Sequence, residues 1–267
     1  MSDTEQSLAV DTGLDIQPTR NPLGFSYGPG IFGPEAENRT LDRIRPSLKD
    51  PDCGGPEIVY SIAMDVGKES HRAVLEQKGL LFGVVTYASG RLGEEPVRSQ
   101  GHIHAVSRYS EGWSTPEVYE IWRGKAVIYM QETAEDDPGR CFAVEAEPGN
   151  VVIVPPGWAH ATISANPDQA LTFGAWCVRD YAFEYEKVRA HNGLAWFPVL
   201  GEGGRISWEH NPAYRRNGLI VKSPRDYPDF SIDSGTPIYK QFEEDHGRFD
   251  FVLQPGRYSR LWQDFTP

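Results

Sequence analysis

Two stretches decide the expected fold of this chain, Ser99-Gln-Gly-His102-Ile-His104 and Gly149-Asn-Val-Val-Ile-Val-Pro-Pro-Gly-Trp-Ala-His160. Side chains alternate between the two faces of a strand, so His102 and His104 project to the same side and can reach one ion. Glu117 begins the next expected strand, and a β-barrel could bring it and His160 over this histidine pair. Three imidazoles and one carboxylate suit a divalent first-row ion such as iron, manganese, nickel, cobalt or zinc.

Short strands are expected at regular spacing around these stretches. They are predicted at Leu80–Tyr87, Pro96–His102, Glu117–Arg123, Ala126–Glu132, Cys141–Glu147, Val151–Val154, Ala159–Ser164 and Ala170–Cys177. Turns that contain Gly, Pro, Asp or Asn separate them. This pattern predicts a mainly β domain built as an antiparallel sandwich or barrel.

The flanking regions have other patterns. Residues 1–22 are polar and predict a flexible N-terminal arm. Short helices are expected at Glu35–Ile44 and Lys68–Lys78, the second ended by Gly79, with a strand near Ile58–Ala63 between them. Beyond Glu184, many aromatic residues are scattered among charged ones, which predicts a C-terminal segment packed on the barrel or on a partner subunit.

Composition restricts the possible partners. The 267 residues carry a formal net charge of -12, which disfavours nucleic acid and anionic membranes as partners, because both require a basic surface. The three cysteines, Cys53, Cys141 and Cys177, lack the spacing of a disulfide framework or zinc knuckle and favour a reducing compartment. With no signal-like or membrane-spanning apolar run in the sequence, we expect a cytoplasmic protein.

The two stretches resemble the motifs of the cupin superfamily. The second motif is matched at Gly149, Pro155, Gly157 and His160, with Ser164 in place of the usual Asn, and the first at His102, His104, Glu117 and Gly124, with Pro96 in place of the earlier Gly. The resemblance implies a double-stranded β-helix, or jelly-roll barrel, with short N-terminal helices and a C-terminal extension. It also implies that His102, His104, Glu117 and His160 bind one divalent metal ion.

The interval between His104 and Glu117 is long for the first motif. Glu111 is therefore a reserve candidate for the carboxylate ligand. We prefer Glu117 because Glu-Val-Tyr119 continues into a strand-like segment that ends at Gly124. Residues 105–116 are then an inserted loop at the mouth of the barrel, where such loops often shape access for a substrate.

Further matches narrow the resemblance to the cupin-type glucose-6-phosphate isomerases of archaea and some bacteria. They cover about residues 24–200, and the specific parts are Gly101-His-Ile-His-Ala105 and Val154-Pro-Pro-Gly-Trp-Ala-His160. The resemblance implies isomerisation between glucose 6-phosphate and fructose 6-phosphate at an iron or manganese ion, with nickel, cobalt or zinc as further possibilities. Hydrogen could move between C1 and C2 as a proton or as a hydride.

The same resemblance assigns roles to individual residues. It implies catalytic roles for Glu117, His160 and Tyr119, and substrate contacts at Tyr60, Ser99, Gly101 and Tyr119, with the phosphate near Ser99–Gly101. Two positions depart from the archaeal pattern: Cys177 stands where a tyrosine is expected, and Val84 or Val85 where a threonine is expected. These departures bear on the phosphate contacts and so on the identity of the sugar.

We therefore expect an N-terminal arm over residues 1–22, a cupin isomerase-like domain over 23–200 and an extension over 201–267. A homodimer with a small sugar phosphate as its substrate is the expected assembly. Three alternatives stay open: an isomerase of another sugar or sugar phosphate, a metal-dependent dioxygenase on the same fold, and a non-catalytic sugar-binding cupin.

Overall fold

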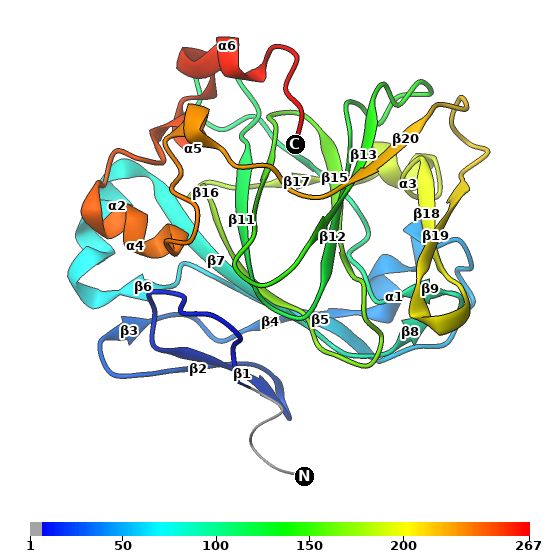
Figure 1. Ribbon diagram of the computed structural model, residues 1–267, viewed down its shortest axis with the longest axis horizontal. Helices are drawn as coiled ribbons and strands as arrows, with labels where there is room; N and C mark the ends of the chain where they lie inside the picture. Colours follow the sequence, from blue (N-terminus) through cyan, green and yellow to red (C-terminus); the bar gives the residue numbers. More distant parts are fainter. Residues whose placement is uncertain (1–6) are drawn as a thin grey trace.

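Two β-sheets form the centre of the molecule in the computed structural model, which describes residues 7–267 (Figure 1). The larger sheet has the strand order β14-β11-β16-β7-β5-β4 and is antiparallel throughout. Its strands are β4 (Glu37–Thr40), β5 (Ile58–Met64), β7 (Leu80–Tyr87), β11 (Glu117–Arg123), β14 (Val151–Val154) and β16 (Thr172–Val178). The smaller sheet has the order β15-β12-β13-β20, in which only the pairing of β13 with β20 is parallel. Its strands are β12 (Ala126–Gln131), β13 (Cys141–Ala146), β15 (Ala159–Ser164) and β20 (Leu219–Lys222).

Alternation along these strands separates an inner face from an outer face. In β11, Tyr119 and Ile121 join a buried cluster with Ile128 and Met130 of the opposite sheet. Val118 and Trp122 face the other way and belong to a second cluster. Both faces of each sheet are covered, which explains why several strands are buried along their whole length.

The C-terminal segment covers the outer face of the larger sheet. Helix α4 (Ile238–Glu244) and helix α5 (Asp250–Leu253) lie there beside α2 (Arg72–Lys78) (Figure 1). Trp176 of β16 stacks on Tyr239 with ring centroids 5.5 Å apart and contacts Phe242 at 4.9 Å. The aromatic residues of this segment therefore pack on the barrel, which is one of the two placements that we expected.

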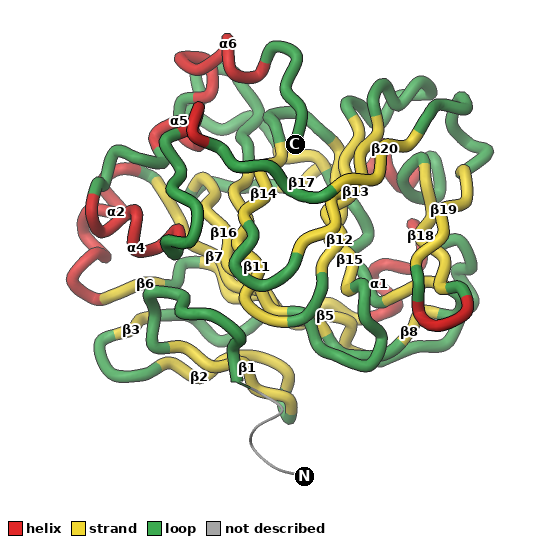
Figure 2. The backbone as a smooth tube through the Cα atoms, in the orientation of Figure 1, coloured by secondary structure: helices red, strands yellow, loops and turns green. Residues whose placement is uncertain are grey.

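A separate layer covers the outer face of the smaller sheet. It contains helix α3 (Glu186–Ala190) and the antiparallel hairpin of β18 (Trp196–Leu200) and β19 (Ile206–His210). Val188, Leu194 and Tyr214 of this layer are buried against residues of β12, β13 and β15. Figure 2 shows helices α2, α4, α5 and α6 (Ser259–Trp262) at the left and top of the molecule, whereas β18 and β19 lie at its right edge.

The N-terminal region adds short strands and helices. Strand β1 (Ile16–Arg20) pairs with β2 (Leu23–Tyr27), and Ile16 is only 1% exposed. The expected arm therefore does not extend over this strand, and residues 1–6 lie outside the described part of the chain. The helix expected at 35–44 is largely wrong, because residues 37–40 form β4 and only α1 (Leu41–Ile44) is helical.

Of the remaining predictions, one helix agrees closely with the structure and one strand agrees only in part. Helix α2 (Arg72–Lys78) ends at Gly79, which adopts a left-handed conformation with φ of 78°. Of the strand expected at 96–102, only Pro96 lies in a short strand, and Arg98 and His102 form isolated bridges. The other short elements are β3 (Ile31–Phe32), β6 (Gly67–Lys68), β8 (Arg91–Leu92), β9 (Glu95–Pro96), β10 (Ile103–His104), β17 (Phe183–Glu184), α6 (Ser259–Trp262) and five 3-10 turns at Arg45–Ser47, Glu69–His71, Glu202–Gly204, Pro228–Phe230 and Pro255–Tyr258. The prediction of a mainly β jelly-roll barrel with short N-terminal helices and a C-terminal extension is confirmed.

No helix within residues 7–267 is long and apolar enough to cross a membrane.

Glu120 links the larger sheet to the C-terminal segment and predicts a dependence of stability on pH. Its carboxylate accepts hydrogen bonds from Trp122 Nε1 at 2.8 Å and from the backbone N–H of Ile238 at 3.2 Å. Burial raises the pKa of Glu120 to about 7, above its ordinary value of 4.5. The folded state therefore binds more protons than the unfolded state between these two values, and ionisation of Glu120 lowers the free energy of unfolding as pH rises through this window.

Ionisation of Glu120 should destabilise the unsubstituted protein but not Glu120→Gln. When the pH is raised from 4.5 to 8, the free energy of unfolding of Glu120→Gln should therefore rise by roughly 2–4 kcal/mol relative to that of the unsubstituted protein. Urea unfolding of both proteins at several pH values measures this difference. A stability difference that stays constant with pH would show that Glu120 does not titrate in this window.

Candidate metal centre

The four expected ligands come from three segments that meet between the two sheets. The backbone N–H of His102 donates to the carbonyl of His160 at 3.0 Å, and the N–H of His160 donates to the carbonyl of His102 at 2.9 Å. His160 lies in β15 of the smaller sheet, and His104 lies in the short strand β10. Glu117 begins β11 of the larger sheet. The tertiary fold thus brings together side chains that are up to 58 residues apart in the sequence.

The ligand atoms of these four residues all lie within 4.8 Å of one another. Glu117 Oε2 is 3.3 Å from His104 Nε2 and 3.4 Å from His160 Nε2. These contacts do not have hydrogen-bond geometry, and the Nε2 atoms of all three histidines are buried without a hydrogen-bond partner among the described residues. Buried polar atoms without partners are costly, and convergent imidazole nitrogens beside a carboxylate are the donor set of a divalent metal ion. The group could hold such an ion.

Backbone carbonyls orient two of the imidazoles for this purpose. His104 Nδ1 lies 3.1 Å from the carbonyl oxygen of Thr115, and His160 Nδ1 lies 3.0 Å from that of Trp158. A carbonyl only accepts, so Nδ1 must carry the proton and Nε2 keeps a free lone pair. This arrangement is the usual support for a histidine that binds a metal through Nε2.

The electrostatics of the group are consistent with ligand binding. Burial lowers the pKa of His102 and of His160, and the neighbouring imidazoles lower them further. Burial acts to raise the pKa of Glu117, but the adjacent His104 and His160 outweigh it and hold this pKa well below its usual range. Neutral imidazoles and an ionised carboxylate are the protonation states that bind a cation.

Glu111 lies apart from this group. It is an exposed residue of the loop between β10 and β11, with φ of 51°, and does not belong to the four-residue cluster. The geometry therefore favours Glu117 over Glu111 as the carboxylate of the site.

Aromatic residues surround the four side chains. Tyr119 is 2% exposed, and its hydroxyl donates to Glu117 Oε2 at 2.6 Å. Tyr60 is 8% exposed and stacks on Tyr87 with ring centroids 4.9 Å apart. Phe183 of β17 packs against His102 with ring centroids 4.4 Å apart. No sequence pattern indicated Phe183, because its position depends on the pairing of β10 with β17.

The expected phosphate segment follows the edge of β15. Ser99 exchanges hydrogen bonds with Thr162, whose N–H donates to Ser99 Oγ at 3.1 Å and whose carbonyl accepts from the Ser99 N–H at 3.0 Å. Gly101 has φ of 89°, and a Cβ there would lie 2.8 Å from Leu194 Cδ1. Glycine is therefore required at this position by both backbone conformation and space.

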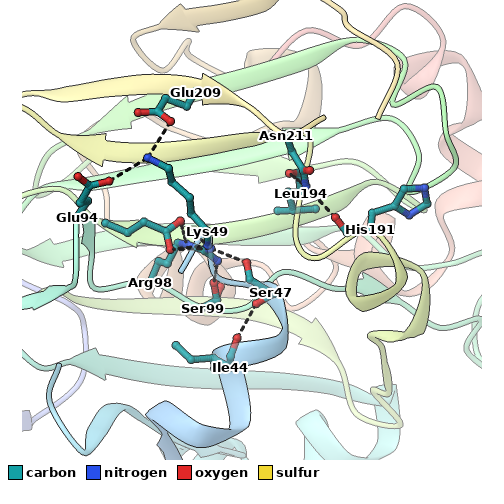
Figure 3. Close-up of polar contacts among 11 residues, drawn as sticks. Ile44, Ser47, Lys49, Glu94, Arg98, Ser99, His191, Leu194, Glu209 and Asn211 are labelled. Carbon is teal, nitrogen blue, oxygen red and sulfur yellow. Dashed lines mark hydrogen bonds and ion pairs between the residues drawn. The ribbon is translucent and has the colours of Figure 1, made fainter. Parts of the chain in front are cut away.

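Arg98 anchors this segment, and Figure 3 shows it among its polar partners. Arg98 is 3% exposed, and its guanidinium forms an ion pair with buried Glu95 at 2.9 Å and donates to the carbonyls of Ser99 at 2.9 Å and Ser47 at 2.6 Å. Burial raises the pKa of Glu95, and the charge of Arg98 opposes this effect. Arg98 immediately precedes the predicted stretch, but its role depends on partners that the sequence does not reveal.

The positions that depart from the archaeal pattern, Val84, Val85 and Cys177, are also buried. Val85 belongs to the buried cluster between the sheets, whereas Val84 faces the opposite side. Cys177 is 2% exposed and close enough to Glu117 for their charges to interact. Neither valine offers a hydrogen bond to a phosphate group.

This fold and this site define the class of protein: a cupin with a candidate metal centre of three histidines and one glutamate. The family model described as Glucose-6-phosphate isomerase (GPI) matches residues 48–215. The chain belongs to this family, as the sequence motifs predicted.

Curated relatives agree with this family assignment. The chain is 32% identical over 142 residues to a glucose-6-phosphate isomerase of Thermococcus litoralis, which covers 52% of this chain and 67% of the relative. It is 31% identical over 142 residues to that of Pyrococcus furiosus (53% and 68%). It is 27% identical over 138 residues to a putative glucose-6-phosphate isomerase 1 of Rhizobium meliloti (51% and 58%).

Solved structures show more remote similarity. An oxalate oxidase superposes with a TM-score of 0.36 at 11% identity, covering 50% of this chain and 59% of the other. The oxalate decarboxylase of Bacillus subtilis gives a TM-score of 0.34 at 18% identity, covering 47% and 27%.

Arg98→Met should destabilise the protein by about 3–5 kcal/mol, because it leaves the Glu95 carboxylate buried without its counter-ion. Chemical denaturation measures this loss. Arg72→Met is the matched control: its ion pair with Glu69 is largely exposed, with side-chain exposures of 43% and 55%, and its loss should cost less than about 1 kcal/mol. Equal effects of the two substitutions would contradict an anchoring role for Arg98.

Proposed function

We propose that this protein is a metal-dependent aldose–ketose isomerase that interconverts glucose 6-phosphate and fructose 6-phosphate. The observation that carries the proposal is the buried group of His102, His104, Glu117 and His160 inside the segment that matches the glucose-6-phosphate isomerase family. The archaeal relatives are named glucose-6-phosphate isomerases, which supports the same reaction.

The donor set suits iron or manganese first, and nickel, cobalt or zinc as alternatives. When bound, such an ion supplies Lewis-acid stabilisation of the negative charge that gathers on the two sugar oxygens during isomerisation. His102, His104, Glu117 and His160 are the proposed ligands.

Other side chains of the site orient these ligands and the sugar. Tyr119 donates to Glu117 Oε2, which restricts the carboxylate to one orientation. Glu117, His160 and Tyr119 are the proposed catalytic residues, with Glu117 as the candidate to carry a proton between C1 and C2. Tyr60, Ser99 and Gly101 are proposed to contact the substrate.

Reaction in deuterium oxide tests how hydrogen moves between C1 and C2. Proton transfer by a side chain introduces solvent deuterium into the product, and a hydride shift does not.

A second candidate is an isomerase of a different sugar or sugar phosphate. Val85 and Cys177 are the observations that favour it, because they replace expected polar side chains in the barrel interior.

We further propose a cytoplasmic homodimer. The family resemblance supports the dimer, and the three free, buried cysteines suit a reducing compartment.

The first expected result is restoration of activity by a metal. Protein stripped with a chelator should convert no glucose 6-phosphate, and addition of iron or manganese should restore formation of fructose 6-phosphate in a coupled assay. The oxygen concentration should stay constant, because isomerisation consumes none. If the protein binds metal but none of the five ions restores conversion of glucose 6-phosphate, the proposed substrate is contradicted. Oxygen consumption would favour a dioxygenase.

Substitution of a proposed ligand should separate metal binding from folding. His160→Ala should abolish both stoichiometric metal content and activity while the thermal transition of the metal-free protein persists, because the barrel core is built from other residues. Glu111→Ala is the matched control and should retain metal and activity. Loss of metal in Glu111→Ala, with retention in Glu117→Ala, would reverse the carboxylate assignment.

A further inference from the structure

We propose that Arg39 and Arg189 form an anion subsite that binds the phosphate group of the sugar. This inference rests on the proposed function and deepens it. Neither arginine belongs to the expected phosphate segment, and Arg39 lies before the region that matches the family model, residues 48–215. The two residues are far apart in the sequence, and both interact electrostatically with one tyrosine, Tyr185.

Arg39 reaches the site from β4, the edge strand of the larger sheet. It is paired with Tyr60 across the strands, and its guanidinium interacts with the Tyr60 hydroxyl. The Arg39 side chain is only 19% exposed, whereas its ion-pair partner Glu37 is 67% exposed. An exposed carboxylate pairs weakly because water screens it, so an incoming anion can take its place.

Arg189 approaches from α3 on the other side. Its Nε donates to Gln100 Oε1 at 3.0 Å, and Gln100 is 4% exposed within the Ser99–Gly101 segment. Its guanidinium carbon lies 5.1 Å from the centre of the Tyr185 ring. Arginine has five N–H donors in a fixed fork, so a single bond to Gln100 leaves donors for a phosphate oxygen.

Tyr185 connects these two cations to the candidate metal centre. Its hydroxyl interacts electrostatically with both Arg39 and Arg189. Its ring centroid is 5.9 Å from that of His102. The phosphate of glucose 6-phosphate is at the opposite end of the carbon chain from C1 and C2, so its subsite must lie one sugar length from the ion. Arg189 contacts Tyr185, and Tyr185 in turn contacts His102, so one side chain intervenes between this cation and the proposed ligand.

Charge gives a reason for a dedicated cationic subsite. The chain has a net charge of -12, and a phosphate dianion that approaches it is repelled unless cations lie at the site. The interior position Val85 supplies no hydroxyl, so the contact that a threonine there would make to a phosphate is missing, and Ser99 has only one O–H to donate. Guanidinium groups bind phosphate through charge-assisted, often bidentate hydrogen bonds, so they can replace these missing contacts.

Calorimetric titration of metal-free protein with inorganic phosphate tests the subsite without requiring turnover. We expect the unsubstituted protein to bind phosphate, with affinity at least about tenfold lower in Arg39→Met and in Arg189→Met. Arg43→Met, an exposed arginine of the adjacent helix α1, is the matched control and should bind as the unsubstituted protein does. Arg39→Lys should recover part of the affinity, which a purely structural role would not predict.

Steady-state kinetics of the metal-loaded proteins give the second measurement. The KM for glucose 6-phosphate should rise at least about tenfold in each methionine variant, with kcat changed less than about threefold and metal content unchanged. The subsite would be overturned if the unsubstituted protein does not bind phosphate, or if all variants bind it with equal affinity. Arginine-dependent phosphate binding without any glucose 6-phosphate turnover would instead overturn the proposed reaction and leave the subsite standing.

Discussion

The pair of backbone hydrogen bonds between His102 and His160 is the constraint on which the site depends. These bonds join two segments that are far apart in the sequence and set their register at the point where both present a histidine. The ring centroids of the two residues are consequently 4.3 Å apart. A shift of register by one residue would turn one histidine to the outer face, because side chains alternate along a strand.

Burial of this polar group opposes folding and must be offset elsewhere. Three imidazole nitrogens without partners in an apolar interior lower the stability of the metal-free protein. The surrounding structure supplies the compensation through two outer layers, in which the C-terminal aromatic residues cover one sheet and α3 with β18 and β19 covers the other. A barrel buried on both faces restricts the movement of the four convergent polar side chains between its sheets.

The sequence predicted the strands well and the connections less well. Leu80–Tyr87, Glu117–Arg123, Val151–Val154 and Ala159–Ser164 agree at both ends with the structure, because turn residues bound each apolar run. Residues 37–40 were predicted as helix, and their strand conformation depends on pairing with β5, which has no local signal. His102 and His104 were identifiable because side chains alternate along a strand, and Glu117 and His160 because they match the cupin motifs. Arg98 and Arg189 were not, since their roles arise from contacts between distant segments.

The residues on either side of the family match also shape the barrel and its site. Residues 216–267 supply the aromatic side chains that cover Phe82 and Trp176, so the larger sheet does not expose its outer face to water. Residues 37–40 extend the same sheet by one strand and place a cation beside Tyr60. The flanking segments thus act on the shared barrel in two ways: one excludes water from the sheet, and the other changes the charge next to the site. Because both effects operate through strand edges and faces, they can alter the preference for a substrate while the metal ligands stay in place.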